Sequence, residues 1–152
     1  MEESNNILIN IKEINETSFI LRQLPLPIEE IQFGKNLSFG LGLGFKINLD
    51  IEELRLSFSI TYKVDKFENH VVELTSEIVF EIKDLAKVAS SEKDGQYQIN
   101  DDFLVTLVGI SIGTTRGMLA ANTKGSPLAK FPLPILNPKE LLEQMNKQSG
   151  EK

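Results

Sequence analysis

Hydrophobic and polar residues alternate along three successive stretches of this chain. Between residues 38 and 49 the odd positions are apolar, from Phe39 to Leu49, while the even positions carry serine, glycine, lysine and asparagine. Residues 54–64 and 72–83 repeat the alternation. A period of two places the apolar side chains on one face of an extended chain. Each stretch therefore predicts a long, half-buried β-strand.

The connections between these strands, residues 50–53 and 65–69, are short. Short connections imply antiparallel neighbours, because a parallel pair needs a crossover of about a dozen residues. A further, shorter strand is predicted within residues 7–21, where Ile7, Ile9 and Ile11 lie at alternate positions. The LPLPIEEIQFG segment that follows contains two prolines, which exclude a central strand. We expect it to form an ordered crossover loop.

The pattern changes after residue 84. Residues 89–102 are polar and contain Gly95, which favours a turn. Asp101 or Asp102 is a suitable N-cap for a helix running from Phe103 to about Asn122. A strand is the alternative because LVTLVGISI is rich in β-branched residues, but the cap, the length and the continuation RGMLAAN favour a helix.

The remaining sequence predicts an extended, proline-rich segment, SPLAKFPLPILNP, and then a short helix over PKELLEQMNKQ, with Pro138 in its first turn. Strands followed by helices indicate an α+β fold. We expect residues 1–152 to form a single domain, with residues 145–152 as a frayed tail.

The composition of the chain excludes several classes of protein function. The chain has 152 residues, of which 41% are hydrophobic and 25% are charged, as in one folded domain. A net charge of −6 and scattered lysines and arginines argue against nucleic acid as a partner. The absence of cysteine excludes disulfides, thiolate zinc sites and thiol catalysis.

The start, MEESNN, lacks the basic residues of a secretory signal. The longest apolar run, Phe103–Ile112, has ten residues, fewer than the roughly eighteen that span a bilayer. We therefore expect a soluble, cytoplasmic protein without membrane insertion.

Candidate catalytic chemistry is sparse. The glycines of GLGLGF, residues 40–45, are the outward positions of a strand rather than a phosphate-binding loop, which needs a helix directly after it. They predict a flat surface that another backbone approaches closely. His70 is the only histidine and lies in a turn, without the signature of a metal site or a catalytic triad. We expect no enzyme activity, no metal and no cofactor.

Two sets of residues allow both a binding role and a purely structural one. The acidic row Glu73, Glu77 and Glu81 is either a docking face for a basic partner or a solvated sheet face. The apolar residues of the crossover loop and of residues 131–136 either cover the sheet or line a groove for an apolar ligand.

The glycines of the long helix are regularly spaced. Gly109, Gly113 and Gly117 lie four residues apart and form one stripe, although each costs about 1 kcal/mol in helix propensity. Ile110 and its neighbours leave almost no polar face in the first turns, so the helix must be buried on all sides. Small residues permit close helix contacts. We predict a subunit interface at Gly109, Gly113, Gly117 and Ile110; the alternative is that the stripe faces the chain's own sheet.

Several segments, taken in order, resemble the SecB family of export chaperones. They are INIKEINETSF, then IQFGKNLSFGLGLGFKINLD before two long strands, then Thr115-Arg116-Gly117 near the end of the helix, and finally LPILNPKELL. The resemblance implies a four-stranded antiparallel sheet with a long helix and a short C-terminal helix on one face. It also implies assembly as a dimer of dimers.

The family holds unfolded chains in apolar grooves, without ATP, until they are exported or handed on. The crossover loop and the terminal helix region form these grooves, and they correspond here to Leu24, Leu26, Ile28, Phe33, Phe131, Leu133, Ile135, Leu141 and Leu142. The resemblance thus implies a holdase for non-native polypeptides, with an export motor or an antitoxin as a further partner.

The glycine content of the helix departs from typical members, which leaves room for a relative dedicated to guarding an antitoxin. Two other functions compete with the holdase. One is an adaptor that binds a single partner protein, such as an antitoxin. The other is a monomeric carrier of a small apolar ligand.

Overall fold

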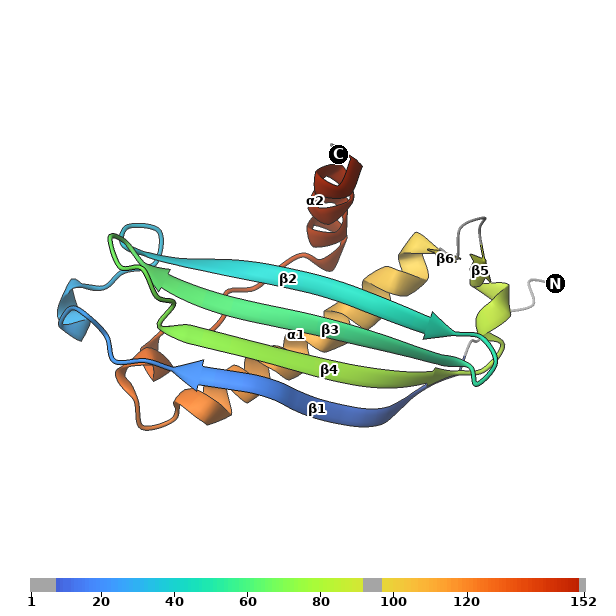
Figure 1. Cartoon of the computed structure of the whole chain (residues 1–152), viewed down its shortest axis with the longest axis horizontal. Helices are drawn as coiled ribbons and strands as arrows, with labels where there is room; N and C mark the ends of the chain where they lie inside the picture. Colours follow the sequence, from blue (N-terminus) through green and yellow to red (C-terminus); the bar gives the residue numbers. More distant parts are fainter. Residues whose placement is uncertain (1–7, 92–96, 151–152) are drawn as a thin grey trace.

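A four-stranded antiparallel sheet organises the computed structural model, which describes residues 8–91 and 97–150. The sheet has the order β1-β4-β3-β2. Its strands are β1 (Ile9–Leu21), β2 (Leu37–Asn48), β3 (Glu53–Val64) and β4 (Val72–Ile82). Strands β2, β3 and β4 form the predicted meander, and residues 22–36 cross the end of the sheet to join β1 to β2 (Figure 1). Both β1 and β2 are therefore edge strands.

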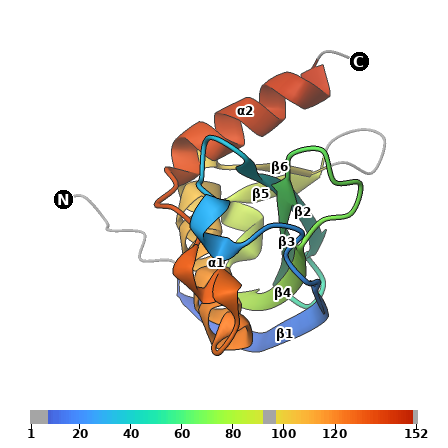
Figure 2. The ribbon, with the colours of Figure 1, turned by 90° about the vertical axis from the view of Figure 1, so that its left-hand side faces the viewer.

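Two α-helices complete the chain. Helix α1 (Asp101–Thr123) lies along one face of the sheet, and α2 (Pro138–Gly150) begins beside α1 and extends past the β2 edge (Figures 1 and 2). The α+β prediction, with four antiparallel strands, a long helix and a short C-terminal helix, is confirmed. Residues 151–152 of the predicted tail lie outside the described residues.

Short elements connect the longer ones. The single turns η1 (Ile28–Glu30), η2 (Leu85–Lys87) and η3 (Pro127–Lys130) are 3₁₀-helices. Strands β5 (Ala89–Ser91) and β6 (Tyr97–Ile99) pair where a polar loop was predicted. Their three-residue length is too short for a period to be visible in the sequence. Gly95, the predicted turn, lies outside the described residues.

Two details of the prediction are wrong. Strand β1 is not shorter than the others, since it has 13 residues. Register shifts between Ile11 and Glu13, and between Glu16 and Ser18, break its alternation, which explains why only its first residues had a clear pattern. The N-cap of α1 is Asn100, whose side chain accepts a hydrogen bond from the N–H of Phe103, rather than Asp101 or Asp102.

The core lies between α1 and the two central strands. The inner-face rows of β3 and β4 are buried, and α1 packs on them with a stripe of residues spaced three or four apart: Leu104, Leu107, Val108, Ser111, Ile112, Thr115, Leu119 and Thr123. Within this contact the hydroxyls of Ser76 and Thr115 are 2.7 Å apart, and both residues are fully buried. Because buried hydroxyls need partners, this pair fixes the register of the helix on the sheet.

Helix α1 has the length and apolar composition of a membrane span. Its buried stripe is instead covered by the sheet. The core helix of a soluble protein has the same composition, so this property does not by itself indicate that α1 spans a membrane.

The glycines of β2 face outward, as predicted, but within residues 8–91 and 97–150 no second backbone lies within 4 Å of a Cβ atom added to Gly40, Gly42 or Gly44. A Cβ atom added at Gly40, Gly42 or Gly44 would lie 2.8, 2.4 or 3.2 Å from a hydroxyl oxygen of β3. The hydroxyls belong to Thr61, Ser59 and Ser57, the paired residues of β3. Side chains of the neighbouring strand therefore occupy this space.

Candidate functional site

The inner face of β2 is an apolar row that α1 leaves largely uncovered. Its side chains point to the same face as the buried row of β3, since Phe39 pairs with Tyr62 and Phe45 pairs with Leu56. Helix α1 packs on β3 and β4. Every inner-face residue of β3 from Leu54 to Val64 is fully buried, whereas Phe45 is 40% exposed. We call Phe39, Leu41, Leu43, Phe45 and Ile47 the β2 row; all of them retain solvent exposure.

Residues 131–137 form an extended segment beside α1, which we call the C-terminal strip. The phenol of Tyr62 donates to the carbonyl of Phe131 at 2.8 Å. The guanidinium of Arg116 donates from Nε to the carbonyl of Leu133 at 3.0 Å and from Nη2 to that of Pro134 at 2.8 Å. Burial raises the pKa of Tyr62, so the phenol keeps the proton that it donates. These bonds hold the strip in one conformation.

Rings from the crossover loop fasten the strip to the sheet. The ring of Phe33 meets those of Phe39, Tyr62 and Phe131 edge to face, with centroids 6.1, 5.3 and 5.5 Å apart. Edge-to-face pairs contribute about 0.5–1.5 kcal/mol each beyond the burial of their area. Phe33 thus connects the crossover loop, the β2 row and the strip into one apolar surface.

A cavity of about 450 Å³ lies between the crossover loop and η3. Apolar residues dominate its wall, and Arg22, Gln23 and Ser126 supply the polar groups. Its apolar lining consists of Leu21, Leu24, Leu26, Pro27, Ile28, Pro127 and Leu128.

The structure distributes the predicted groove residues over three places. Leu24, Leu26 and Ile28 line this cavity. Phe33 and Phe131 belong to the aromatic cluster, and Leu133 and Leu142 are buried, with 3% and 8% of their surface exposed.

The other two predicted groove residues are more open. Leu141 is half-buried, while Ile135 is 95% exposed on the strip. A contact of any of these residues with a ligand stays a prediction. The prediction missed the β2 row, because its alternation is the same as that of the fully buried β3.

The glycine stripe of α1 faces away from the sheet. Cβ atoms added at Gly113 and Gly117 would have no atom within 4 Å, and one at Gly109 would lie 3.5 Å from Cγ of Pro138. The alternative in which the stripe packs on the chain's own sheet is therefore wrong. Ile110 is half-buried. A contact of this stripe with another subunit stays a prediction.

The edge strand β1 also has uncovered apolar side chains. Ile11 and Ile14 pair with Phe80 and Ile78 of β4 on the inner face, yet they are 46% and 48% exposed. Both edges of the sheet thus expose apolar side chains on the face that carries α1.

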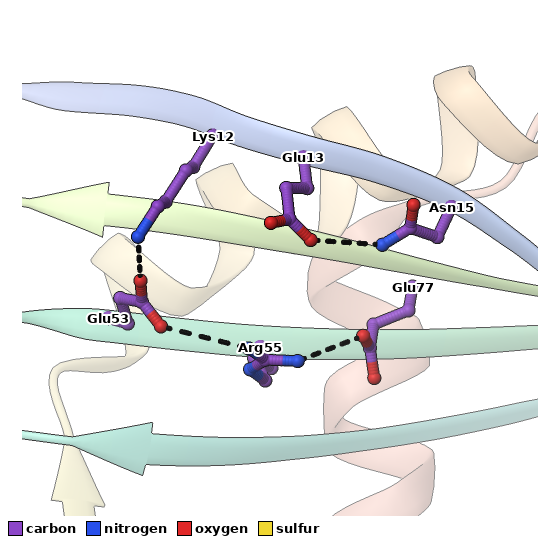
Figure 3. Close-up of polar contacts among 6 residues, drawn as sticks. All are labelled: Lys12, Glu13, Asn15, Glu53, Arg55 and Glu77. Atoms are coloured by element: carbon purple, nitrogen blue, oxygen red, sulfur yellow. Dashed lines mark hydrogen bonds and ion pairs between the residues drawn. The ribbon is translucent and has the colours of Figure 1, made fainter.

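The outer face of the sheet is polar, and ion pairs cross its strands (Figure 3). Glu53, which is 6% exposed, pairs with Lys12 of β1 and lies 3.9 Å from Arg55, which in turn contacts Glu77 at 3.4 Å. The hydrogen bond and the charge of Glu53 raise the pKa of Lys12. The negative charge of Glu77 is therefore partly neutralised by Arg55 on the neighbouring strand.

Glu73 is paired as well. It accepts from Arg22 at 3.0 Å and lies 3.5 Å from Nδ1 of His70. The hydrogen bond from Arg22 holds the pKa of Glu73 below its usual range. Glu81 is exposed and lies opposite Glu53 in the register. The acidic row is thus partly neutralised, and its docking role stays a prediction. Within residues 8–91 and 97–150, no three His, Asp or Glu side chains gather as a metal site would need.

Comparison with known proteins gives a likeness of structure but none of sequence. No protein-family model matches the sequence, and no curated protein does either. Among solved structures, the chain is similar to a SecB-like chaperone of Mycobacterium tuberculosis, solved in complex with a ChAD peptide from the HigA1 antitoxin. The TM-score is 0.47 and the identity 14%, over 84% of this chain and 90% of that one.

Proposed function

We propose that this protein binds non-native polypeptides on the apolar surface formed by the β2 row, the aromatic cluster and the C-terminal strip. The β2 row is the observation that carries the proposal. A row of large apolar side chains on an edge strand, partly exposed beside a hydrogen-bonded strip, is typical of a binding surface. Monomeric soluble proteins rarely expose contiguous apolar patches without such a role.

The chemistry of this surface suits many sequences rather than one small molecule. It is long, open and built from aliphatic and aromatic side chains, with main-chain groups of an edge strand beside them. Such a surface recognises extended polypeptide through area and main-chain hydrogen bonds. Binding of this kind requires no nucleotide and no bond-breaking step, so the proposed activity is that of an ATP-independent holdase in the cytoplasm.

Assembly is part of the proposal. Weak binding at each of several surfaces becomes tight when one client chain reaches more than one of them. The outward glycine stripe of α1 and the exposed Ile11 and Ile14 of β1 provide surfaces for contacts between subunits. A dimer of dimers, as in the SecB family, would place several client surfaces on one particle.

The test is light scattering on a size-fractionated sample, with and without a reduced, unfolded client protein. We expect a mass above that of one subunit and suppression of client aggregation at a stoichiometric ratio. A monomer that leaves aggregation unchanged would refute the proposal. Competition separates a general holdase from an adaptor of one partner such as an antitoxin, because unrelated unfolded chains displace a client only from the holdase.

A further inference from the structure

The two edges of the sheet differ in how they are protected. Strand β1 carries two register shifts, and its charged residues include Lys12, Glu13 and Glu16, the last of which accepts from Asn122 of α1. Strand β2 pairs with β3 without a register shift and contains one charged residue, Lys46. Sheets avoid unwanted pairing through bulges and charges at their edges. Strand β2 lacks a bulge and nearly all charge, so it remains open to another strand.

The main-chain groups of β2 point alternately toward β3 and away from it. The carbonyl of Asn36 accepts from the N–H of Asp65 at 2.8 Å, which assigns the even-numbered residues to the ladder with β3. The odd-numbered residues then direct N–H and C=O outward. Leu37 agrees with this, since it donates to the carbonyl of Gln32 at 3.2 Å and accepts from Gly34 at 3.1 Å.

Beyond Leu37 the outward groups have no such partner. Over the part of the chain that the structure describes, no hydrogen bond reaches these main-chain atoms of the β2 row. The same residues point their apolar side chains to the inner face. The stretch Phe39–Ile47 thus combines free main-chain donors and acceptors with an apolar side.

Charge and shape define what can occupy this edge. On the outer face, the exposed charged residues of β2 and β3 are the cations Lys46, Arg55 and Lys63. Uncharged or acidic side chains therefore suit the outer positions of an added strand. Helix α2 extends past this edge (Figures 1 and 2), so a second sheet approaching edge to edge would meet it before β2. A single extended segment is thinner than a whole sheet and meets less of α2.

We propose that β2 takes up an extended segment of a client polypeptide as a fifth strand of the sheet. The segment alternates apolar residues, which face the α1 side, with uncharged or acidic residues, which face outward. This inference rests on the proposed function and specifies how the client is held. Because the sheet is antiparallel throughout, we expect antiparallel addition.

The test uses a fluorescent synthetic peptide about nine residues long, which matches the extent of the free edge. Its leucines alternate with serine and glutamate. One version is N-methylated at the leucines and another at the residues between them, because a strand added to one edge uses the N–H groups of alternate residues only. For antiparallel addition, methylation at the leucines should weaken binding about tenfold or more, and the other version should bind within about twofold of the parent peptide.

A pair of variants tests the same edge on the protein. Leu43→Pro removes an outward N–H and places the proline ring at the edge, while the ladder with β3 is kept. Leu43→Ala loses the same side chain but retains the N–H, and so serves as the matched control. We expect Leu43→Pro to bind the unmodified peptide about tenfold more weakly than Leu43→Ala, with the same mass for both variants.

Three outcomes would overturn strand addition. Equal weakening by the two N-methylated peptides would do so, and so would equal binding by the two Leu43 variants. Dissociation of the assembly by Leu43→Pro alone, without peptide, would mean that β2 pairs with a second copy. If the protein binds neither the peptide nor any unfolded chain, the proposed function fails with it. If the protein binds the peptide equally well whichever alternate residues are N-methylated, only strand addition is refuted and the proposed function stands.

Discussion

Gly113→Leu should stabilise the isolated subunit and weaken the assembly. Glycine is about 0.8–1.0 kcal/mol less favourable than alanine in a helix interior, and leucine is close to alanine. No atom lies within 4 Å of a Cβ placed at this position, so the added side chain meets no obstacle within the subunit. We therefore expect the free energy of unfolding of the subunit to rise by about 0.7 kcal/mol.

The effect on the assembly has the opposite sign. If the glycine stripe lets a second subunit approach closely, a leucine side chain at this position separates the two backbones. Overpacking of a close contact costs about 1–3 kcal/mol per site, and a symmetric contact contains the site twice. A total of about 2 kcal/mol or more corresponds to at least a thirtyfold increase in the dissociation constant.

Two measurements check this prediction. Light scattering on a dilution series gives the dissociation constant, and urea unfolding below the concentration of assembly gives the stability of the subunit. Gly113→Ala is the control, because it gains most of the helix propensity while adding only one methyl group. Gly109 is a poorer site, since its Cβ would lie 3.5 Å from Pro138 and a larger side chain would also disturb α2. An unchanged mass for Gly113→Leu, or a loss of subunit stability, would refute the reasoning.

The polar contacts give three further predictions. Arg116→Ala removes two charged hydrogen bonds to the C-terminal strip, so amide hydrogen exchange in residues 131–137 should accelerate at least tenfold and client binding should weaken; unchanged exchange would contradict this. Ser76→Ala combined with Thr115→Val should show a coupling of about 1 kcal/mol in a double-mutant cycle of urea unfolding, and strict additivity would argue against the buried hydrogen bond. Because Arg22 lowers the pKa of Glu73 in the folded state, the stabilisation by this pair is present above the ordinary pKa of 4.5 and is lost as the pH falls through the lowered value. Acid unfolding of Glu73→Gln should lack this component, and an identical pH profile for both proteins would count against it.

The sequence predicted strands β2 and β3 well because their alternation is uninterrupted. Strands β2 and β3 pair in one register over twelve residues, from Leu37 opposite Val64 to Asn48 opposite Glu53. The length of strand β1 was underestimated, because each of its two bulges reverses the face on which the next apolar residue lies. Periodicity can detect a strand only where the register is regular.

The direction of the α1 glycines could not be predicted from periodicity. The helix is apolar on nearly every side in its first turns, so no polar face marks which side turns away from the sheet. Its core stripe also contains buried hydroxyls, at Ser111, Thr115 and Thr123, which further reduce the difference in polarity between the faces of the helix. Each of these hydroxyls donates to the carbonyl four residues earlier, which allows it to be buried at little cost. Only contact with the sheet decides the orientation.

The candidate binding surface depends on topology in a way that no local pattern records. Strands β2 and β3 have the same alternation of apolar and polar residues, yet β3 is central and β2 is an edge, because the crossover places β1 beside β4 instead of β2. Burial follows from that order: Leu56 of β3 is fully buried, while its partner Phe45 on β2 is 40% exposed. A strand kept only for stability would gain by having polar residues at such exposed positions. Strand β2 instead keeps an apolar inner row, has no bulge and carries a single charge, Lys46, which is the arrangement expected when a transient partner covers this edge.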